Sequence, residues 1–253
     1  MNEKTNHSLT GLTSASGVST LTLNREAARN ALSIDLLESL HARVDSLERS
    51  KDKVVVITGA GKAFCAGMDL KAVLSDTAAA HRLLSLLGEL CIKIRALPQV
   101  TLACVNGAAI GGGCGLACVC DLAITHADSK LGFPEVDLGV CPAVVAPWLV
   151  RKIGPGRARK VLLSGGLMSG AEAHAIGMVD AVAASREALA GEASRMAERI
   201  ATGGAMALQA TKSLLNTLDD SLDHDLAREG AALSARVLAT PEAQAMLRAK
   251  MSS

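Results

Sequence analysis

Short apolar runs in the first half of the chain predict buried β-strands. Residues 54–58 and 100–105 are unbroken β-branched and aliphatic stretches, and each opens into a glycine-containing segment. The sequence GVSTLTL at 17–23 predicts another strand, and residues 122–133 predict two more short ones. Helical patterns separate these strands, and this alternation favours a parallel sheet with right-handed crossovers.

Stretches with apolar residues three and four positions apart predict amphipathic helices. Residues 33–50 carry such a pattern behind Ser33, whose hydroxyl is suited to cap a helix N-terminus. The pattern from about 77 to 97 predicts a second helix, which Pro98 ends.

The C-terminal part of the chain is predicted to be helical. Helical patterns dominate from residue 144 onward, and the apolar stretch at 178–182 interrupts them. Ala- and Leu-rich sequence from residue 186 to the end predicts three or four successive helices, with breaks at 202–204 and 240–241.

Length and composition agree with one α/β domain that carries a helical appendage. The 253 residues suffice for a large core, which we expect over residues 1–190, with the helical region over residues 191–253. The net charge is +1 and the Lys and Arg residues are scattered, so no basic stripe is available for nucleic acid. Phe64, Phe133 and Trp148 are the only aromatic residues, which leaves no platform for base stacking.

The seven cysteines lie mostly inside apolar runs, which predicts small buried side chains rather than a metal site. Cys114, Cys118 and Cys120 are close in sequence, but His126 is the one histidine near them, and this run is typical of a buried helix that enters a strand. The polar N-terminus lacks the apolar segment of a signal peptide, and no 18-residue apolar span is found. We expect a cytoplasmic protein without a membrane partner.

Two glycine-rich segments are candidates for binding a carbonyl oxygen. AFCAGMDL (63–70) and NGAAIGGGCGLACVCDLAI (106–124) each place a turn after a buried strand, and such turns expose backbone N–H groups. Two N–H groups aimed at one point form an oxyanion hole, which stabilises charge that develops during a reaction. The helix after the second turn directs its positive end toward the same ligand.

Glu135 is the candidate for proton transfer. It follows Phe133 and Pro134 in FPEVDLGVCP (133–142) and precedes an apolar run, so its carboxyl enters a dry environment. Burial raises the pKa of a carboxyl toward neutrality, where a general acid or base is most effective. The alternative is an exposed glutamate on a loop.

These three segments, in this order and spacing, resemble the crotonase superfamily, also called the enoyl-CoA hydratase/isomerase family. The resemblance covers roughly residues 15–250, because it includes LTLNREAARNALS (21–33), IGPGRARKVLLSGGLMSGAEAHAIGMVD (153–180) and ALQATKSLLN (207–216). It implies a crotonase-like ββα-superhelix core and a C-terminal helical region that packs at a trimer interface. It also implies an acyl-CoA thioester substrate, no further cofactor, and a homotrimer or a dimer of trimers.

The resemblance assigns roles to individual residues. The amides of Met68 and Gly112 would hold the thioester oxygen, and Glu135 would act as general acid or base. Arg25 matches a position near the phosphate or adenine end of CoA, although it is equally explained as an exposed charge at a strand end. Asp69 fits a catalytic role or a helix cap. The residues that the resemblance places at the substrate are Arg25, Ala27, Ala66, Asp69, Leu70, Gly111, Gly115, Pro134 and Ala143.

The chain departs from the family pattern at Gly115. Simple enoyl-CoA hydratases carry two glutamates that share one water, and the first occupies this position, where glycine cannot transfer a proton. The family usually has a glycine directly after the proline that matches Pro142, whereas this chain has Ala143, which keeps the backbone N–H.

A single Glu135 leaves several reactions open. It could activate water for hydration of a 2-enoyl-CoA, which we favour, because the sequence resembles bacterial hydratases of branched, glutaconyl-type CoA esters that also lack the first glutamate. It could instead shuttle a proton between C2 and C4, as in a Δ3-Δ2 enoyl-CoA isomerase. A catalytically silent acyl-CoA-binding protein is the alternative of a different class. His81 and Arg82, in the segment expected to wall the acyl pocket, could meet a substrate carboxylate, but both are expected to be exposed.

Overall fold

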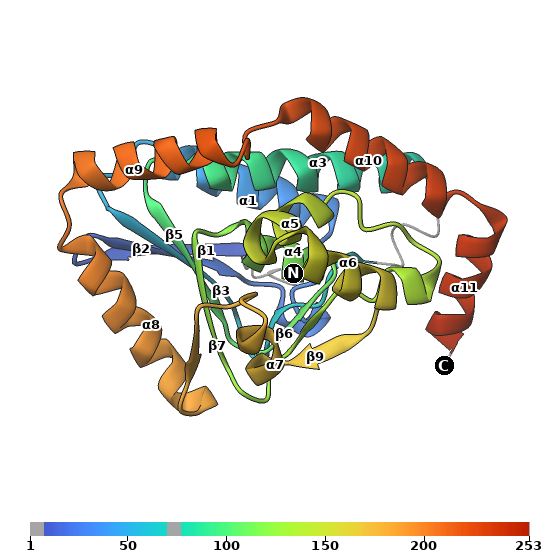
Figure 1. Cartoon of the computed structure of the whole chain (residues 1–253), viewed down its shortest axis with the longest axis horizontal. Coiled ribbons are helices and arrows are strands. Elements are labelled where there is room, and N and C mark those ends of the chain that lie inside the picture. Colours follow the sequence, from blue (N-terminus) through green and yellow to red (C-terminus); the bar gives the residue numbers. More distant parts are fainter. Residues whose placement is uncertain (1–7, 70–76, 253) are drawn as a thin grey trace, which may run out of the picture.

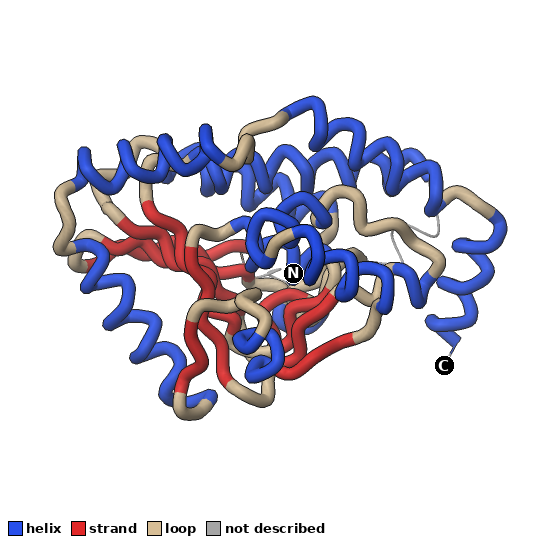
Figure 2. Tube along the Cα trace, in the orientation of Figure 1, coloured by secondary structure: helices blue, strands red, loops and turns tan. Residues whose placement is uncertain are grey.

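The computed structural model describes residues 8–69 and 77–252, which fold around two β-sheets covered by helices (Figures 1 and 2). The strands are β1 (Thr10–Ala15), β2 (Val18–Leu23), β3 (Val54–Gly59), β4 (Ala63–Cys65), β5 (Val100–Val105), β6 (Ala108–Ile110), β7 (Leu122–His126), β8 (Lys130–Gly132), β9 (Leu167–Ser169) and β10 (Ala181–Ala183). The helices are α1 (Ile34–Leu47), α3 (Thr77–Ala96), α4 (Gly112–Val119), α5 (Ala146–Ile153), α6 (Pro155–Ser164), α7 (Gly170–Ala175), α8 (Arg186–Ala201), α9 (Ala205–Leu218), α10 (His224–Leu238) and α11 (Pro241–Ser252), with short 3-10 turns η1 (Glu26–Ala28) and η2 (Val136–Leu138).

The larger sheet has the strand order β1-β2-β3-β5-β7-β10, and the smaller one has the order β4-β6-β8-β9. All neighbouring strands are parallel except β1 with β2 and β8 with β9. The expectation of a parallel sheet is therefore confirmed for most of the fold. The expectation that residues 178–182 alone interrupt the helices after residue 144 is wrong. Strand β9 also interrupts them, and it pairs with β8. Three residues are too few to show a strand period.

The unbroken apolar run of β3 is explained by burial on both faces of the larger sheet. Val55 and Ile57 belong to the main core under α1 and α3, whereas Val54 and Val56 pack in a second core against α8. Because side chains alternate along a strand, a strand covered on both sides has no polar face. Figure 1 shows α1 and α3 on one side of the sheet and α8 on the other.

The helices expected from the sequence are confirmed. Ser33 caps α1, because its Oγ accepts a hydrogen bond of 3.3 Å from the Leu36 N–H. Helix α3 ends at Ala96, two residues before Pro98. The C-terminal region holds α8, α9, α10 and α11. The expected breaks at 202–204 and 240–241 fall between α8 and α9 and at the start of α11, and a further break at 219–223, which was not expected, separates α9 from α10. The expected division at residue 190 falls inside α8.

Helix α10 lies alongside α3 (Figure 1), and the two helices pack closely at Gly88. A Cβ atom on Gly88 would lie 3.5 Å from the Ala227 carbonyl oxygen and 3.8 Å from the Ala227 Cβ, which leaves no room for a longer side chain. Helix α10, although distant in sequence from the strands of the sheet, thereby packs against the main core. Within the described ranges, no helix is long and apolar enough to span a membrane.

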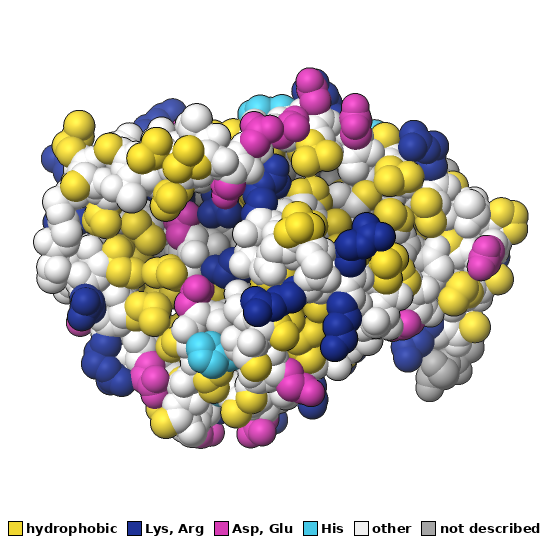
Figure 3. Space-filling view, viewed as in Figure 1, with side chains coloured by type: hydrophobic (Ala, Val, Ile, Leu, Met, Phe, Trp, Pro, Cys, Tyr) yellow, Lys and Arg dark blue, Asp and Glu magenta, His cyan; other side chains and the backbone are white. Residues whose placement is uncertain are grey.

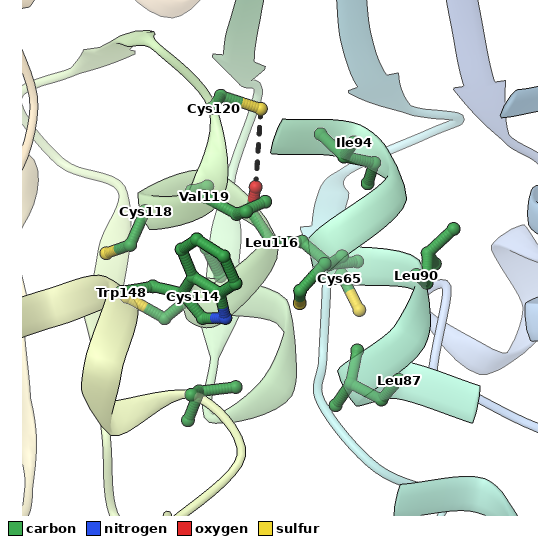
Figure 4. Packing of buried hydrophobic residues seen from close by; sticks show 14 of the residues in the cluster. Cys65, Leu87, Leu90, Ile94, Cys114, Leu116, Cys118, Val119, Cys120 and Trp148 are labelled. Carbon is green, nitrogen blue, oxygen red and sulfur yellow. Dashed lines mark hydrogen bonds between the residues drawn. The ribbon is translucent and has the colours of Figure 1, made fainter. Parts of the chain in front are cut away.

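Helix α4 is the most deeply buried helix of the site region. Figure 4 shows Leu116 and Val119 of α4 between Leu87, Leu90 and Ile94 of α3 on one side and Trp148 of α5 on the other. Cys120 donates its thiol hydrogen to the Leu116 carbonyl at 3.4 Å, the bond drawn as a dashed line. Six of the seven cysteines are buried, which confirms their interpretation as small core side chains.

Candidate active site

The loop after β4 is held so that the Met68 amide is left unpaired. The Leu32 N–H donates to the Gly67 carbonyl at 2.7 Å, and the Asp69 N–H donates to the Leu32 carbonyl at 2.9 Å. Leu32 therefore engages the residues on either side of Met68, and the Met68 N–H points away from it. Among the described residues, none accepts a hydrogen bond from this N–H.

Asn30 fixes the segment that holds this loop. Its backbone has a positive φ of 55° and its side chain is fully buried. The side-chain amide donates to the carbonyls of Ala60 and Ala63, at 3.0 and 2.9 Å, and its oxygen accepts from the Arg25 N–H at 2.9 Å. The motif LNREAARNAL thus joins the turn at η1 to the start of β4, a role that the sequence analysis did not assign.

The second glycine loop brings another free amide to the same place. Gly111 has a φ of 53°, which favours glycine, and α4 begins directly after it at Gly112. A Cβ atom on Gly67 would lie 2.7 Å from the Ile110 carbonyl oxygen and 3.9 Å from the Gly112 nitrogen, so the two loops touch. The Gly112 N–H also has no acceptor within the described ranges. Two N–H groups that lack an acceptor among the described residues therefore lie, with the positive end of α4, where β4 and β6 end.

Glu135 faces the Gly111 backbone from the loop after β8. Its own carbonyl accepts hydrogen bonds from the N–H groups of Leu138 and Val140, at 3.0 and 2.8 Å, which fix the η2 turn. Its Oε1 lies 2.7 Å from the point that a Cβ on Gly111 would occupy, so a side chain at Gly111 would displace the carboxyl. Its Oε2 is closed off from solvent and lacks a hydrogen-bond partner among the described residues.

Burial sets the proton equilibrium of this carboxyl. Desolvation raises the pKa of Glu135 from 4.5 to about 7, an effect that its own backbone N–H partly offsets. The carboxyl is thus poised to take up and to release a proton near neutral pH. The expected rise of its pKa toward neutrality is confirmed.

These groups line one cavity of about 90 Å³. Six of the residues expected at the site contribute to its wall, namely Met68, Gly112, Glu135, Ala66, Gly111 and Pro134. The remainder of the wall is mainly aliphatic and comes from α3, η2 and the residues before α5. The Met68 and Gly112 N–H groups and the Glu135 carboxyl therefore line the same apolar cavity.

Gly115 does not line this cavity, contrary to the expectation. A Cβ atom on Gly115 would lie 2.2 Å from Cγ1 and 2.6 Å from Cβ of Val145, so the Val145 side chain occupies the space above it. Val145, which the sequence analysis missed, lines the cavity in its place. An acid introduced at Gly115 therefore cannot simply face Glu135, because Val145 stands in its path.

Ala143 also lies outside the cavity wall, and its N–H is not free. The Ala143 N–H donates to the Ser234 Oγ at 3.2 Å, and the same hydroxyl donates to the Cys141 carbonyl at 2.8 Å. Ser234 comes from α10 and itself lines the cavity. A residue nearly one hundred positions away holds this loop, and no local sequence signal could have indicated it.

The remaining residues assigned to the substrate lie beside the cavity or beyond it. Arg25 donates to the Asp69 carboxylate and to the Ala31 carbonyl, at 2.8 and 3.0 Å, and Ala27 is exposed on η1. Contact of these residues with CoA stays a prediction. Leu70 lies outside the described residues.

The two cationic candidates for a substrate carboxylate are away from this cavity. Arg82 is 63% exposed and forms an ion pair with Glu38. His81 lines a separate surface hollow between α3 and α10. The described residues also contain no cluster of three metal-ligating side chains.

The chain belongs to the enoyl-CoA hydratase/isomerase family, whose model matches residues 13–248. It is similar to the crotonyl-CoA hydratase of Syntrophomonas wolfei, with 35% identity over 200 residues that cover 78% of this chain and 76% of the relative. It is also similar to the 2,3-dehydroadipyl-CoA hydratase of Escherichia coli, with 35% identity over 212 residues that cover 83% and 82%.

A crystal structure of an enoyl-CoA hydratase/isomerase from Xanthobacter autotrophicus Py2 has a similar fold. The TM-score is 0.86 at 29% sequence identity, and the match covers 97% of this chain and 94% of the other. The crotonase-like α/β fold that the sequence predicts is therefore confirmed.

Proposed function

We propose that the protein is an enoyl-CoA hydratase, which adds water reversibly across the double bond of a 2-enoyl-CoA thioester. The observation that supports this most strongly is the carboxyl of Glu135, which shares a cavity with the N–H groups of Met68 and Gly112. Among the described residues, neither its Oε2 nor these two N–H groups have a hydrogen-bond partner. Relatives that are themselves named hydratases support the same reaction.

In the proposed reaction, Glu135 acts first as a base and then as an acid. The ionised carboxyl takes a proton from water, whose oxygen adds to C3 of the thioester. Negative charge then develops on the thioester oxygen, where the Met68 and Gly112 N–H groups stabilise it. Glu135 returns the proton to C2, which restores the neutral thioester and the ionised carboxylate. We propose no cofactor beyond the CoA of the substrate.

Double-bond isomerisation is a second candidate, and Val145 favours it. Hydration by two glutamates requires a second carboxyl at the water, but the place of that group is filled by an apolar side chain. In the isomerase reaction, Glu135 would remove a proton from C2 of a 3-enoyl-CoA and return it at C4. The same two N–H groups would hold the intermediate dienolate, and no water would be needed.

Paired assays separate these reactions. Crotonyl-CoA hydration is followed by loss of absorbance of the conjugated thioester, and 3-hexenoyl-CoA conversion by its appearance. The proposal predicts that kcat/KM for crotonyl-CoA exceeds that for 3-hexenoyl-CoA. The reverse order would assign the protein as an isomerase, and tight CoA-ester binding without either reaction would identify a silent binding protein.

A further inference from the structure

The chamber beside Glu135 is walled almost entirely by aliphatic side chains. Helix α3, η2 and the segment before α5 contribute Leu83, Leu84, Leu87, Leu138, Val144 and Val145. Two polar side chains join them. The Ser234 hydroxyl is already bonded to the Cys141 carbonyl and the Ala143 N–H, and the Cys141 thiol is a weak donor.

Among the described residues, no Lys, Arg or His lines this chamber. Two cations of the neighbouring segments are engaged elsewhere: Arg82 pairs with Glu38 on the surface, and Arg25 pairs with Asp69. Of the described residues in the wall, Glu135 is the single one with a carboxyl, so the charge that this part of the chamber can develop is negative.

An acyl chain that ends in a carboxylate would meet two costs in such a chamber. The carboxylate would lose its hydration without gaining a cation or a free hydrogen-bond donor, and burial of an unpaired charge is strongly unfavourable. It would also lie near Glu135, and two carboxylates in a dry space repel each other. A neutral chain of the same shape would meet neither cost and would bury apolar surface.

We propose that this cavity selects acyl-CoA esters whose acyl chain carries no charge, and that it rejects dicarboxylic acyl chains of the glutaconyl type. The cavity can discriminate in this way because the charged chain is disfavoured, and the neutral chain then needs no specific polar contact of its own. The inference rests on the proposed function for the identity of the cavity as the acyl site, but it concerns binding and not turnover.

The test compares two saturated thioesters of matched shape. Glutaryl-CoA and 5-methylhexanoyl-CoA differ in that a terminal carboxylate replaces an isopropyl group, and isothermal titration at pH 8 gives both Kd values. We expect 5-methylhexanoyl-CoA to bind at least about tenfold more tightly, which corresponds to about 1.4 kcal/mol. Equal affinity, or tighter binding of glutaryl-CoA, would overturn the inference. Because neither compound can be hydrated, loss of the hydratase proposal alone would leave this result unchanged.

Two variants examine the cause. Glu135→Gln removes the repelling carboxylate, so the ratio of the glutaryl-CoA Kd to the 5-methylhexanoyl-CoA Kd should fall by at least about threefold. An unchanged ratio would show that Glu135 does not contribute to rejection.

Leu138→Lys places a cation in the chamber from a half-buried position, and glutaryl-CoA should bind at least about tenfold more tightly than to the wild type. Leu138→Met is the uncharged control and should not improve glutaryl-CoA binding; an equal gain in both variants would contradict an electrostatic cause.

Discussion

At the scale of single residues, the surroundings of Glu135 decide how the site responds to pH. Its carboxyl has a pKa raised by burial to about 7, and only the ionised form can accept a proton from water. We therefore predict that kcat/KM for crotonyl-CoA rises about tenfold per pH unit below pH 7 and levels off above it. A pH profile from 5.5 to 9 measures this. A profile that stays flat down to pH 5.5 would mean that the Glu135 carboxyl is solvated in the active protein and keeps a pKa near its ordinary value.

The packing of Val145 against Gly115 leads to a second prediction at this scale. Gly115→Glu alone should lower the free energy of unfolding, because its Cβ would overlap the Val145 side chain, and overpacking costs about 1–3 kcal/mol. Val145→Ala would not relieve the overlap, since the Val145 Cβ itself lies 2.6 Å from the new atom. The double variant with Val145→Gly clears both atoms.

Crotonyl-CoA hydration by the double variant should exceed that of Val145→Gly alone by at least about tenfold, a cautious fraction of one general acid or base. Urea unfolding and initial rates of the two single variants and the double variant provide the comparison. If Gly115→Glu alone folds with wild-type stability, the contact between Val145 and Gly115 is not as described.

At the scale of elements, α10 contributes to the active site through Ser234. The variant Ser234→Ala would leave the Ala143 N–H and the Cys141 carbonyl without their partner, at a cost of about 1–3 kcal/mol in unfolding free energy. The same change should raise KM for crotonyl-CoA more than it lowers kcat, because Ser234 positions the wall and transfers no proton. Ser213→Ala, at an exposed position on α9, is the matched control. Equal effects of both variants on KM would remove α10 from the site.

How far these elements could be predicted depends on their length and on the distance between contacting residues. Strand β3 and helix α1 were predictable, because an unbroken apolar run and a cap at Ser33 are local signals. The three-residue strands β4, β6 and β9 carry no period of their own and form by pairing across the second sheet. Val145 and Ser234 reach the cavity through tertiary packing, which a local pattern does not encode.

The glycine loops and Glu135 were predictable for a different reason. Gly111 has a positive φ, which favours glycine, and a side chain there would displace the Glu135 carboxyl. Requirements of this kind are visible in the sequence as a glycine at a fixed position. The glycine at position 115 was also visible in the sequence. It reflects the contact with the Val145 side chain and not an open substrate site.

At the scale of the whole molecule, α9 presents an apolar surface. Figure 3 shows hydrophobic side chains over α9 and toward α8, and Met206, Leu214, Leu215 and Leu218 are exposed, Met206 by 80% and Leu218 by 73%. A surface of this kind is typical of an interface. It supports the expected homotrimer or dimer of trimers, in which this surface would be buried.

Light scattering should accordingly give three or six times the chain mass of 25.9 kDa. The double variant Leu214→Glu with Leu218→Glu should shift the protein toward the monomer, because charge would enter the buried contact. Leu163→Glu, at a leucine on α6 that is 70% exposed, is the control and should leave the assembly intact. A monomeric wild type at micromolar concentration would contradict the assembly.

In the proposed mechanism, Glu135 transfers the proton, while backbone amides and an apolar wall hold the thioester. Glu135→Gln keeps the size of the side chain and the amides of Met68 and Gly112, but it removes the group that exchanges protons. Single-turnover rates with crotonyl-CoA, together with the Kd of the non-reactive butyryl-CoA, test the claim most directly. We predict a rate lowered by at least about 10² and a Kd within a few fold of the wild type. Near wild-type turnover by Glu135→Gln would contradict it.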